Sequence, residues 1–445
     1  MFLILQFVLI LAFIFKEPIA IAQYVPSWSN RVAPVNKHTD AAKPLYSVQF
    51  MTSYVDDHFL NEKFVIDIEA PFPWRDCVVD WNYYEGDCPT CRYPVSCKEY
   101  QCTDLQTTYF YRSHSCHSVN SGSKSPGSQH CNCPVNVVSP VDGTCSQALL
   151  NYDLFSLNAS DGRNPYPSTY NSGPNAGCVP SSVFDSFPEN VRGVMAFSRS
   201  PYAKPTGVMV VGHNPYDVRV WKDILAICLP STLSSPGVMF FGDSPYYFIP
   251  NSNVDIRGLL SYTPLLKHPD SFGYFIDVKA IVIKGRSINV SYAGNSTTKL
   301  STTEPYTTFR SDIYSSIVRI FLKVTKRIPA AKPVAPFGLC YNISKNRTKP
   351  GLKVPDIHLL LQGGSKWTIS TANSVKQVTT HVACLAFIDG GLTSEPPIVL
   401  GTFQFEDNFL VFDEGDSTLG FSSSLINKGT SCANFNFTTP SNMYP

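Results

Sequence analysis

Nine of the chain's fourteen cysteines fall between positions 77 and 145, and this cluster limits the fold more than any other feature. An even number of cysteines favours disulfide bonds. A zinc ribbon would need a second pair spaced like Cys88 and Cys91, and Cys131 and Cys133 lie closer together. We therefore expect a disulfide framework, with its pairing left open, from Cys77, Cys88, Cys91, Cys97, Cys102, Cys116, Cys131, Cys133, Cys145, Cys178, Cys228, Cys340, Cys384 and Cys432.

The first fifteen residues are almost wholly apolar. Small residues at Ala20 and Ala22 then precede Gln23, which predicts a signal peptide, residues 1–22, cut after Ala22. A signal anchor is the alternative, but the run is shorter than the roughly 20 apolar residues that span a bilayer. No later segment is apolar enough to cross one, so we expect a secreted protein with no membrane contact after signal-peptide removal.

The sequons agree with an extracellular location, whereas the charge balance bears on the partner. Lys and Arg number 35 and Asp and Glu 34, giving a formal net charge of +1, and this balance argues against a nucleic-acid partner. No cofactor and no metal site are expected. His58, His114, His117 and His130 could hold a metal, but exposed loop histidines are the simpler interpretation.

Glycosylation is predicted at the six Asn-x-Ser/Thr sites, Asn158, Asn289, Asn295, Asn342, Asn346 and Asn436.

Short runs of β-branched and aromatic residues alternate with Gly, Pro, Asn and Ser through most of the chain, which predicts a mostly-β protein. One helix is expected over Asp312–Lys326, where apolar residues recur on one side. The clearest expected strands are Lys63–Ile68, Val208–Val211, Gly237–Phe241, Tyr274–Ile283 and Phe409–Phe412, and the expected surface loops are Asn120–Gln129, Asn158–Gly177 and Lys345–Gly351.

A weak similarity between the two halves of the sequence suggests two similar lobes. Each half has an apolar strand that reaches a distinctive tripeptide, and later an apolar strand that runs into a Gly. We therefore expect four parts: the signal peptide (1–22), an N-terminal segment (23–45), an N-terminal lobe with a cysteine-rich insertion (46–235) and a C-terminal lobe (236–445).

An apolar strand ends in Asp67 within Phe64–Trp74, and Trp74 follows seven residues later. This segment resembles the first active-site loop of pepsin-like aspartic proteases. A second stretch, Ile398–Phe421, contains a Leu-Gly strand, a Phe-Asp and a final apolar-Gly strand at the spacing of the second pepsin lobe. The resemblance implies a two-lobed pepsin-like fold with a central cleft and a few short helices.

Aspartic proteases hold two carboxylates so close that they share a proton, and each lies on a tight loop with a Gly and a hydroxyl. Asp67 is retained here, but Ile68 has no hydroxyl and Glu69 replaces the Gly. Ser301 occupies the position expected for the second Asp, and Ser cannot share a proton in a dyad. Asp312 is the nearest possible substitute, although it fits better as a first-turn helix acid. The pattern predicts a catalytically inactive site.

In this pattern of replaced catalytic residues, the chain resembles a plant group of pepsin-like proteins. It comprises the extracellular dermal glycoprotein, the basic seven-S globulin, and the xyloglucanase and xylanase inhibitors. The resemblance is carried by Ser301–Thr307, and by four further segments, Gly193–Arg199, Ala226–Tyr246, Gln404–Asn408 and Gly420–Leu425. It implies a proteinaceous inhibitor of microbial xylanases, xyloglucanases or related glycoside hydrolases, acting in plant defence in the apoplast or cell wall.

Inhibitors of this group insert loops of the second lobe, carrying Arg or His, into the hydrolase cleft. The corresponding loops here are Lys345–Leu352, with Lys345, Arg347 and Lys349, and Ile388–Pro397, which has Glu395 where the xyloglucanase inhibitors have Arg. A basic side chain can engage the two carboxylates of a glycosidase, whereas an acid would repel them.

Three further interpretations remain open. The chain could be an active aspartic endopeptidase with a second carboxylate beside Asp67, or a peptide- or glycan-binding protein that uses the old cleft. Asp67 and Glu69 could also point the same way and mimic a glycosidase pair.

Overall fold

The computed structural model describes residues 30–55, 58–80, 90–108, 116, 131–172, 175–203, 210–211, 218–219, 223–243, 245–250, 253–290, 297–343, 352 and 354–438. The predicted signal peptide, Cys88, the basic residues Lys345, Arg347 and Lys349, and the sequons at Asn295 and Asn346 lie outside these residues.

The largest sheet of the described residues has 15 strands, and neighbours along it come from both ends of the chain. Its order begins β17-β32-β31-β15-β16-β1 and continues through β9, β2, β3, β12, β4, β11, β8 and β7, with β10 paired to β9. The strands are β1 (Asn30–His38), β2 (Leu45–Val55), β3 (His58–Asp67), β4 (Trp74–Asp76), β7 (Cys133–Val138), β8 (Cys145–Tyr152), β9 (Phe155–Ser160), β10 (Pro165–Ser172), β11 (Asn175–Val179), β12 (Val191–Ala196), β15 (Ile224–Cys228), β16 (Gly237–Phe241), β17 (Ser261–Pro264), β31 (Phe409–Asp413) and β32 (Thr418–Phe421).

The second sheet has nine strands, all from the second half of the chain. A smaller four-stranded sheet lies in the same half, and two short pairs lie in the first half. The strands of the nine-stranded sheet are β18 (Leu266–His268), β19 (Ser271–Ile283), β20 (Arg286–Asn289), β21 (Thr297–Leu300), β22 (Thr307–Phe309), β25 (Ile357–Leu361), β26 (Lys366–Ile369), β29 (Phe387–Asp389) and β30 (Ile398–Leu400). The remaining strands are β23 (Ala330–Ala331), β24 (Cys340–Asn342), β27 (Val375–Gln377), β28 (Val382–Leu385), β5 (Val78–Val79), β6 (Cys91–Arg92), β13 (Val210–Val211) and β14 (Val218–Arg219).

Helices are few and short within the described residues. The α-helices are α2 (Tyr100–Thr107), α4 (Ser311–Val324), α5 (Thr371–Ser374) and α6 (Thr402–Phe405), and the 3₁₀ turns are η2 (Ser181–Phe184), η3 (Ile256–Leu259), η4 (Gln362–Gly364), η5 (Leu425–Lys428) and η6 (Cys432–Asn434). The helix α4 confirms the predicted helix, and its apolar side is buried through Ile313, Ile317 and Phe321. No helix of the described chain has the length and apolar character needed to cross a membrane.

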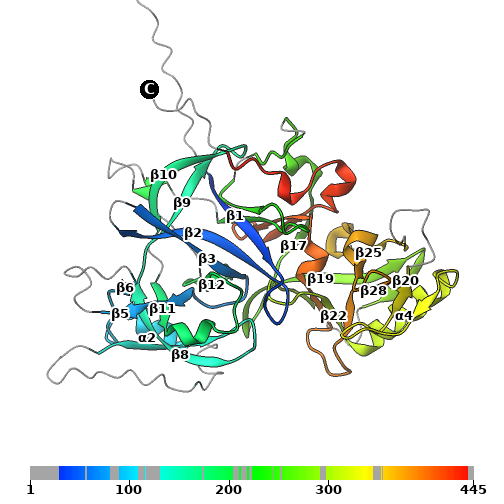
Figure 1. Cartoon of the computed structure of the whole chain (residues 1–445), viewed down its shortest axis with the longest axis horizontal. Coiled ribbons are helices and arrows are strands. Elements are labelled where there is room, and N and C mark those ends of the chain that lie inside the picture. The colour runs from blue at the N-terminus through cyan, green and yellow to red at the C-terminus, as the bar shows by residue number, and fades with distance from the viewer. Residues whose placement is uncertain are drawn as a thin grey trace, which may run out of the picture.

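Figure 1 shows the two halves side by side, with β2, β3, β8 and β11 on one side and β20, β22, β25, β28 and α4 on the other. Strands β1, β17 and β19 lie between them. The largest apolar cluster of the described residues runs through both halves, from Val35 and Phe64 to Ile276 and Trp367. The expected division between residues 235 and 236 falls between β15 and β16, two neighbours of one sheet, and stays a prediction.

The mostly-β prediction is confirmed, but one predicted loop is wrong. Asn158–Gly177, chosen for its polar composition, is largely strand, because β9, β10 and β11 run through it. β10 pairs with β9, and β11 pairs with β8 and β4. Turn-forming residues are common there, yet the ladder to β9 and β8 outweighs their weak local preference. The expected N-terminal segment, 23–45, includes β1, which pairs with β2, β9 and β16.

The disulfide prediction is confirmed, and the structure supplies the pairing. Every described cysteine is disulfide-bonded, including Cys91. The bonds between described residues are Cys77–Cys178, Cys97–Cys131, Cys102–Cys133, Cys116–Cys145, Cys228–Cys432 and Cys340–Cys384.

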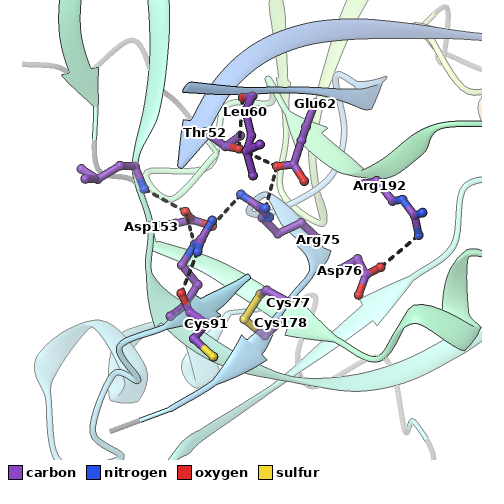
Figure 2. A network of polar contacts seen from close by, with 12 residues as sticks. Thr52, Leu60, Glu62, Arg75, Asp76, Cys77, Cys91, Asp153, Cys178 and Arg192 are labelled. Atoms are coloured by element: carbon purple, nitrogen blue, oxygen red, sulfur yellow. Dashed lines mark hydrogen bonds and ion pairs between the residues drawn. A yellow bond between two sulfur atoms is a disulfide. The ribbon is translucent and has the colours of Figure 1, made fainter. Parts of the chain in front are cut away.

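A buried ionic network lies beside the Cys77–Cys178 bond (Figure 2). The fully buried guanidinium of Arg75 lies between Glu62, at 2.5 Å, and Asp153, at 3.7 Å. Asp153 also accepts a 2.8 Å bond from Arg92. Two cations and two anions thus compensate one another in the interior of the first half.

Candidate functional site

The first candidate loop begins where β3 ends, at Asp67. β3 pairs in parallel with β12, and Asp67 lies opposite Ala196. The Asp67 Oδ1 atom accepts hydrogen bonds from the backbone N–H groups of Glu69, at 2.8 Å, and Ala70, at 3.0 Å. The carboxylate therefore closes a tight turn, although the Gly of the pepsin pattern is absent.

The second candidate loop begins where β21 ends, at Ser301. Its hydroxyl Oγ accepts hydrogen bonds from the N–H groups of Thr303, at 3.3 Å, and Glu304, at 3.1 Å. These are the second and third residues after Ser301, the same offsets as at Asp67. A neutral hydroxyl thus does in this loop what a carboxylate does in the other.

The strands around the two loops repeat the same arrangement. β12 pairs parallel to β3 and antiparallel to β4, and β30 pairs parallel to β21 and antiparallel to β22. Gly401 follows β30, and a Cβ atom on it would lie 2.6 Å from the carbonyl carbon of Tyr306. Only glycine permits this close approach, which fixes the returning chain of the second loop.

One side chain joins the two loops directly. The buried Thr302 hydroxyl donates to the carbonyl of Ile66 at 2.7 Å and accepts from the N–H of Ile68 at 3.2 Å. The equivalent residue of the first loop, Ile68, is buried but has no hydroxyl to return the contact. The link between the loops is therefore one-sided.

The electrostatics of the site centre on Asp67. Burial raises the pKa of the Asp67 carboxyl to about 6, and the negative charge of Glu69 adds to this rise. The two backbone hydrogen bonds and the charge of Lys299 act in the opposite direction. Glu69 itself forms an ion pair with Lys299, at 2.5 Å, so a cation of the second half reaches across to the first loop.

A cavity of about 390 Å³ opens above Asp67. Residues of the first loop, the second loop and the start of β19 line it, together with the β7–β8 hairpin; they include Asp67, Glu69, Phe72, Val138, Pro140, Ser271, Phe272 and Thr303. Its volume falls within the range of small-ligand sites.

The hairpin that forms one wall is fixed to its own half. Val141 at its tip is buried in the core, and Asp142 accepts a 2.9 Å bond from Ser186. Burial acts to raise the pKa of Asp142, but hydrogen bonds from Thr144, Ser139 and Ser186 outweigh it and hold the pKa at about 2.

Two other predicted residues lie together, away from the residues that line this cavity. Asp312, in the first turn of α4, pairs with Arg310 through bonds of 2.9 and 3.0 Å, and Arg310 lowers its pKa. The exposed Glu395 carboxylate lies 3.7 Å from the same Arg310. Arg310 thus partly offsets the negative charge that Glu395 brings to the loop Ile388–Pro397.

The four sequons within the described residues differ in exposure. Asn289, at the end of β20, is exposed, whereas Asn158, Asn342 and Asn436 are partly buried. Glycosylation remains a prediction at each of them.

Sequence reasoning missed three contributors to the site. Thr302 follows Ser301 directly, and the pattern of a hydroxyl beside each acid could have identified it. No local signal marks Lys299, because its partner Glu69 is 230 positions earlier. The hairpin wall was missed because a cavity wall depends on long-range pairing.

Comparison with known proteins agrees with this geometry. A family model described as "Xylanase inhibitor N-terminal" matches residues 50–243, and one described as "Xylanase inhibitor C-terminal" matches residues 273–423. "Gamma conglutin 1" of Prunus dulcis is 34% identical over 85% of this chain and 84% of its own. "Probable aspartic proteinase GIP2" of Nicotiana benthamiana is 31% identical over 92% of both.

Solved structures agree as well. The crystal structure of edgp matches with a TM-score of 0.74 and 30% identity, over 92% of this chain and 98% of that one. The mostly-β, two-lobed, pepsin-like fold and the resemblance seen in the sequence are thereby confirmed. The chain therefore belongs to the family whose models describe the two halves of the xylanase inhibitors.

Proposed function

We propose that this protein is a secreted, glycosylated, catalytically inactive relative of the aspartic proteases. In this proposal it binds and inhibits microbial cell-wall glycoside hydrolases, in plant defence outside the cell. The observation that carries the first part is the Ser301 hydroxyl, which accepts the same pair of amide bonds as Asp67. The family models, named for xylanase inhibitors, support the second part.

Proteolysis at this site would need a second acid. Aspartic proteases pair an ionised carboxylate, as general base, with a protonated one that polarises the carbonyl of the scissile bond. Among the described residues, no carboxyl group is hydrogen-bonded to Asp67; its bonds come from backbone N–H groups. Glu69, the acid whose charge acts on Asp67, is paired with Lys299.

A peptidase assay tests this part. Purified protein incubated with denatured casein at acid pH should give no cleavage that pepstatin blocks. Ser301→Asp alone should stay inactive, because Ile68 and Glu69 still occupy the first loop. The triple variant Ile68→Thr/Glu69→Gly/Ser301→Asp rebuilds both loops and should gain measurable, pepstatin-sensitive cleavage. Such cleavage by the unmodified protein would refute the proposal.

The second-half loop Ile388–Pro397 is well placed for contact with a hydrolase. Asp389 holds its start by accepting bonds from the Ser311 hydroxyl at 2.5 Å and the Gly391 N–H at 3.0 Å. Leu392 at its tip is 78% exposed. A rigid loop with an exposed apolar tip loses little conformational entropy on binding, which favours affinity.

An inhibition screen against purified microbial xylanases, xyloglucanases and pectinases tests the second part. We expect inhibition of at least one enzyme, and Glu395→Arg should strengthen it because an Arg can engage the hydrolase carboxylates. The matched control is Glu189→Arg, the same charge change at an exposed position of the first half. No inhibition across the three classes, or an equal effect of both variants, would argue against this interface.

A second candidate function is peptide or glycan binding in the old cleft, and the cavity above Asp67 favours it. A pull-down from infected plant extract distinguishes the two. A captured hydrolase that is released when Leu392→Asp is introduced supports the loop, whereas captured peptides or glycans displaced by pepstatin support the cleft.

A further inference from the structure

A second cavity, of about 370 Å³, lies over strands β15, β31, β32 and β17, and shares no lining residue with the cavity above Asp67. Its lining includes Tyr262 of β17, Gly420 of β32, Asp413 of β31, and Asp416, Arg257 and Asp243 from the adjoining turns. We propose that this cavity binds a neutral saccharide chain, with one sugar ring stacked on Tyr262.

The Tyr262 ring forms a platform because its cross-strand neighbour has no side chain. Tyr262 pairs with Gly420 in the β17–β32 ladder. A Cβ atom on Gly420 would lie 3.0 Å from the Tyr262 ring, so the ring lies over the glycine. Yet Tyr262 remains 52% exposed, which leaves aromatic surface open to the cavity. The electron-rich face of such a ring attracts the slightly positive C–H groups on one side of a pyranose.

Both hydrogen-bond acceptors and donors surround this platform. Within the described residues, the Asp416 carboxylate has no hydrogen bond or ion pair, and Asp413 is bonded through one oxygen, Oδ1, to the N–H of Asp416. Arg257 donates from Nε to Asp255 and from Nη1 to Asp243. Among the described residues its Nη2 group makes no hydrogen bond, so it can donate to a ligand. Sugar hydroxyls both donate and accept, and charged partners make the stronger bonds to them.

Three carboxylates and one guanidinium line the cavity, so a cation is the competing ligand, but the aromatic platform and the mixture of donors and acceptors favour a neutral polyhydroxylated one. The guanidinium of Arg257 lines the same cavity, so an ammonium ligand near Asp243 would face a like charge. A polyhydroxylated ligand can bind Arg257 and the carboxylates of Asp413 and Asp416 at the same time. The cavity volume also lies within the range of pre-formed small-ligand sites.

Isothermal titration calorimetry on the full-length protein tests the proposal, with cellohexaose, xylohexaose and laminarihexaose as neutral probes and spermidine as the cationic one. We expect at least one hexasaccharide to bind. Tyr262→Ala should weaken that binding about tenfold or more, because it removes the platform. Tyr262→Phe keeps the ring and should stay within about threefold. Tyr100→Ala is the matched control, since Tyr100 is 75% exposed on α2.

Three outcomes would overturn the proposal. One is that none of the three hexasaccharides binds. Another is that Tyr262→Ala binds as well as the unmodified protein, or that Tyr100→Ala loses as much affinity. The third is that spermidine alone binds, with an affinity that falls in high salt, which would assign the carboxylates to a cation. Inhibition of glycoside hydrolases should be unchanged in Tyr262→Ala, so this site and the inhibitor loop can fail separately.

Discussion

The loop after β3 and the loop after β21 share the same hydrogen bonds from backbone N–H groups to the side chain of their first residue, but their first four residues differ at every position. Asp67 and Ser301 each accept two N–H groups at the same offsets. At the next position the second loop has the more polar residue. Thr302 carries a hydroxyl that links the loops, whereas its equivalent, Ile68, has none. The comparison teaches that an oxygen acceptor suffices to hold the turn, so the fold does not require an acid at this position.

The difference extends into the strands that follow the loops. By their pairing with β12 and β30, Arg75 of β4 occupies the place that Phe309 of β22 occupies in the other half. Both residues are fully buried. One half therefore stabilises this position with an ionic network, and the other with apolar contacts.

The largest expected effect comes from breaking that network. Arg75→Met should lower the free energy of unfolding by about 3–5 kcal/mol, because Glu62 and Asp153 lose a buried partner. Chemical denaturation with the disulfides intact measures it. Arg192→Met is the control, because Arg192 makes an exposed pair with Asp76 (Figure 2) worth at most about 1 kcal/mol. Equal losses in both variants would show that the network contributes nothing special.

Removing the link between the loops should come next. Thr302→Val keeps the shape of the side chain but leaves the buried N–H of Ile68 and carbonyl of Ile66 without their partner, at a cost of about 1–3 kcal/mol in unfolding free energy. Thr303→Val is the control in the neighbouring position, where the hydroxyl is hydrogen-bonded, among the described residues, to Ser301 alone. If the two variants unfold alike, the hydroxyl of Thr302 does not join the loops.

A smaller, pH-dependent effect is expected at Asp67. The pKa of this carboxyl is about 6 in the folded protein against a usual value of 3.8, so the folded state binds more protons between these values. Stability is therefore lost as the pH rises through 4 to 6. Asp67→Asn should stabilise the protein at pH above about 6, by about 1–2 kcal/mol after allowance for exposure to the cavity, and should have little effect below about pH 4.

The hairpin acid Asp142 gives the opposite dependence and serves as the control. Its pKa is held at about 2, below the usual 3.8, so it contributes stability above pH 4 that is lost as the pH falls towards 2. Asp142→Asn should therefore destabilise the protein at neutral pH and have no effect near pH 2. Thermal unfolding followed across pH compares the variants, and a parallel response of the two would contradict the assignment.

The smallest effects should come from the pair Glu69 and Lys299. Glu69→Gln should lower the pKa of Asp67 and Lys299→Met should raise it, each by about 0.5 or more, because one removes a like charge and the other an opposite one. Each should change unfolding free energy by less than about 1 kcal/mol, since the pair is partly exposed. Titration of the Asp67 carboxyl by NMR measures both, and shifts in the same direction would show that reorganisation outweighs charge.

Features read from local pattern were predictable from the sequence. The strand that ends at Asp67, the helix α4 and the position of Ser301 each follow from a few neighbouring residues. The family resemblance, carried by short segments, was also within reach. These features depend on periodicity and on motifs whose geometry is local.

Contacts between distant positions could not be predicted. Nothing in the sequence around Arg75 indicates that it is buried, yet long-range strand pairing encloses it between Glu62 and Asp153. The segment Asn158–Gly177 has a loop-like composition, and its neighbours in the sheet make it strand. Burial and partner choice are set by the whole fold, so no window of sequence contains them.

Strand β15 pairs with β16 and β31, and both of these strands follow it in the chain. β16 begins nine residues after it ends, whereas β31 begins at Phe409. During synthesis the first half can therefore fold early, but it keeps an open strand edge until more than nine-tenths of the chain has been made. The Cys228–Cys432 bond, which spans 204 positions, can form only later still. A prematurely ended chain would thus present an unpaired edge and a free thiol together, two features by which cells distinguish unfinished proteins from finished ones.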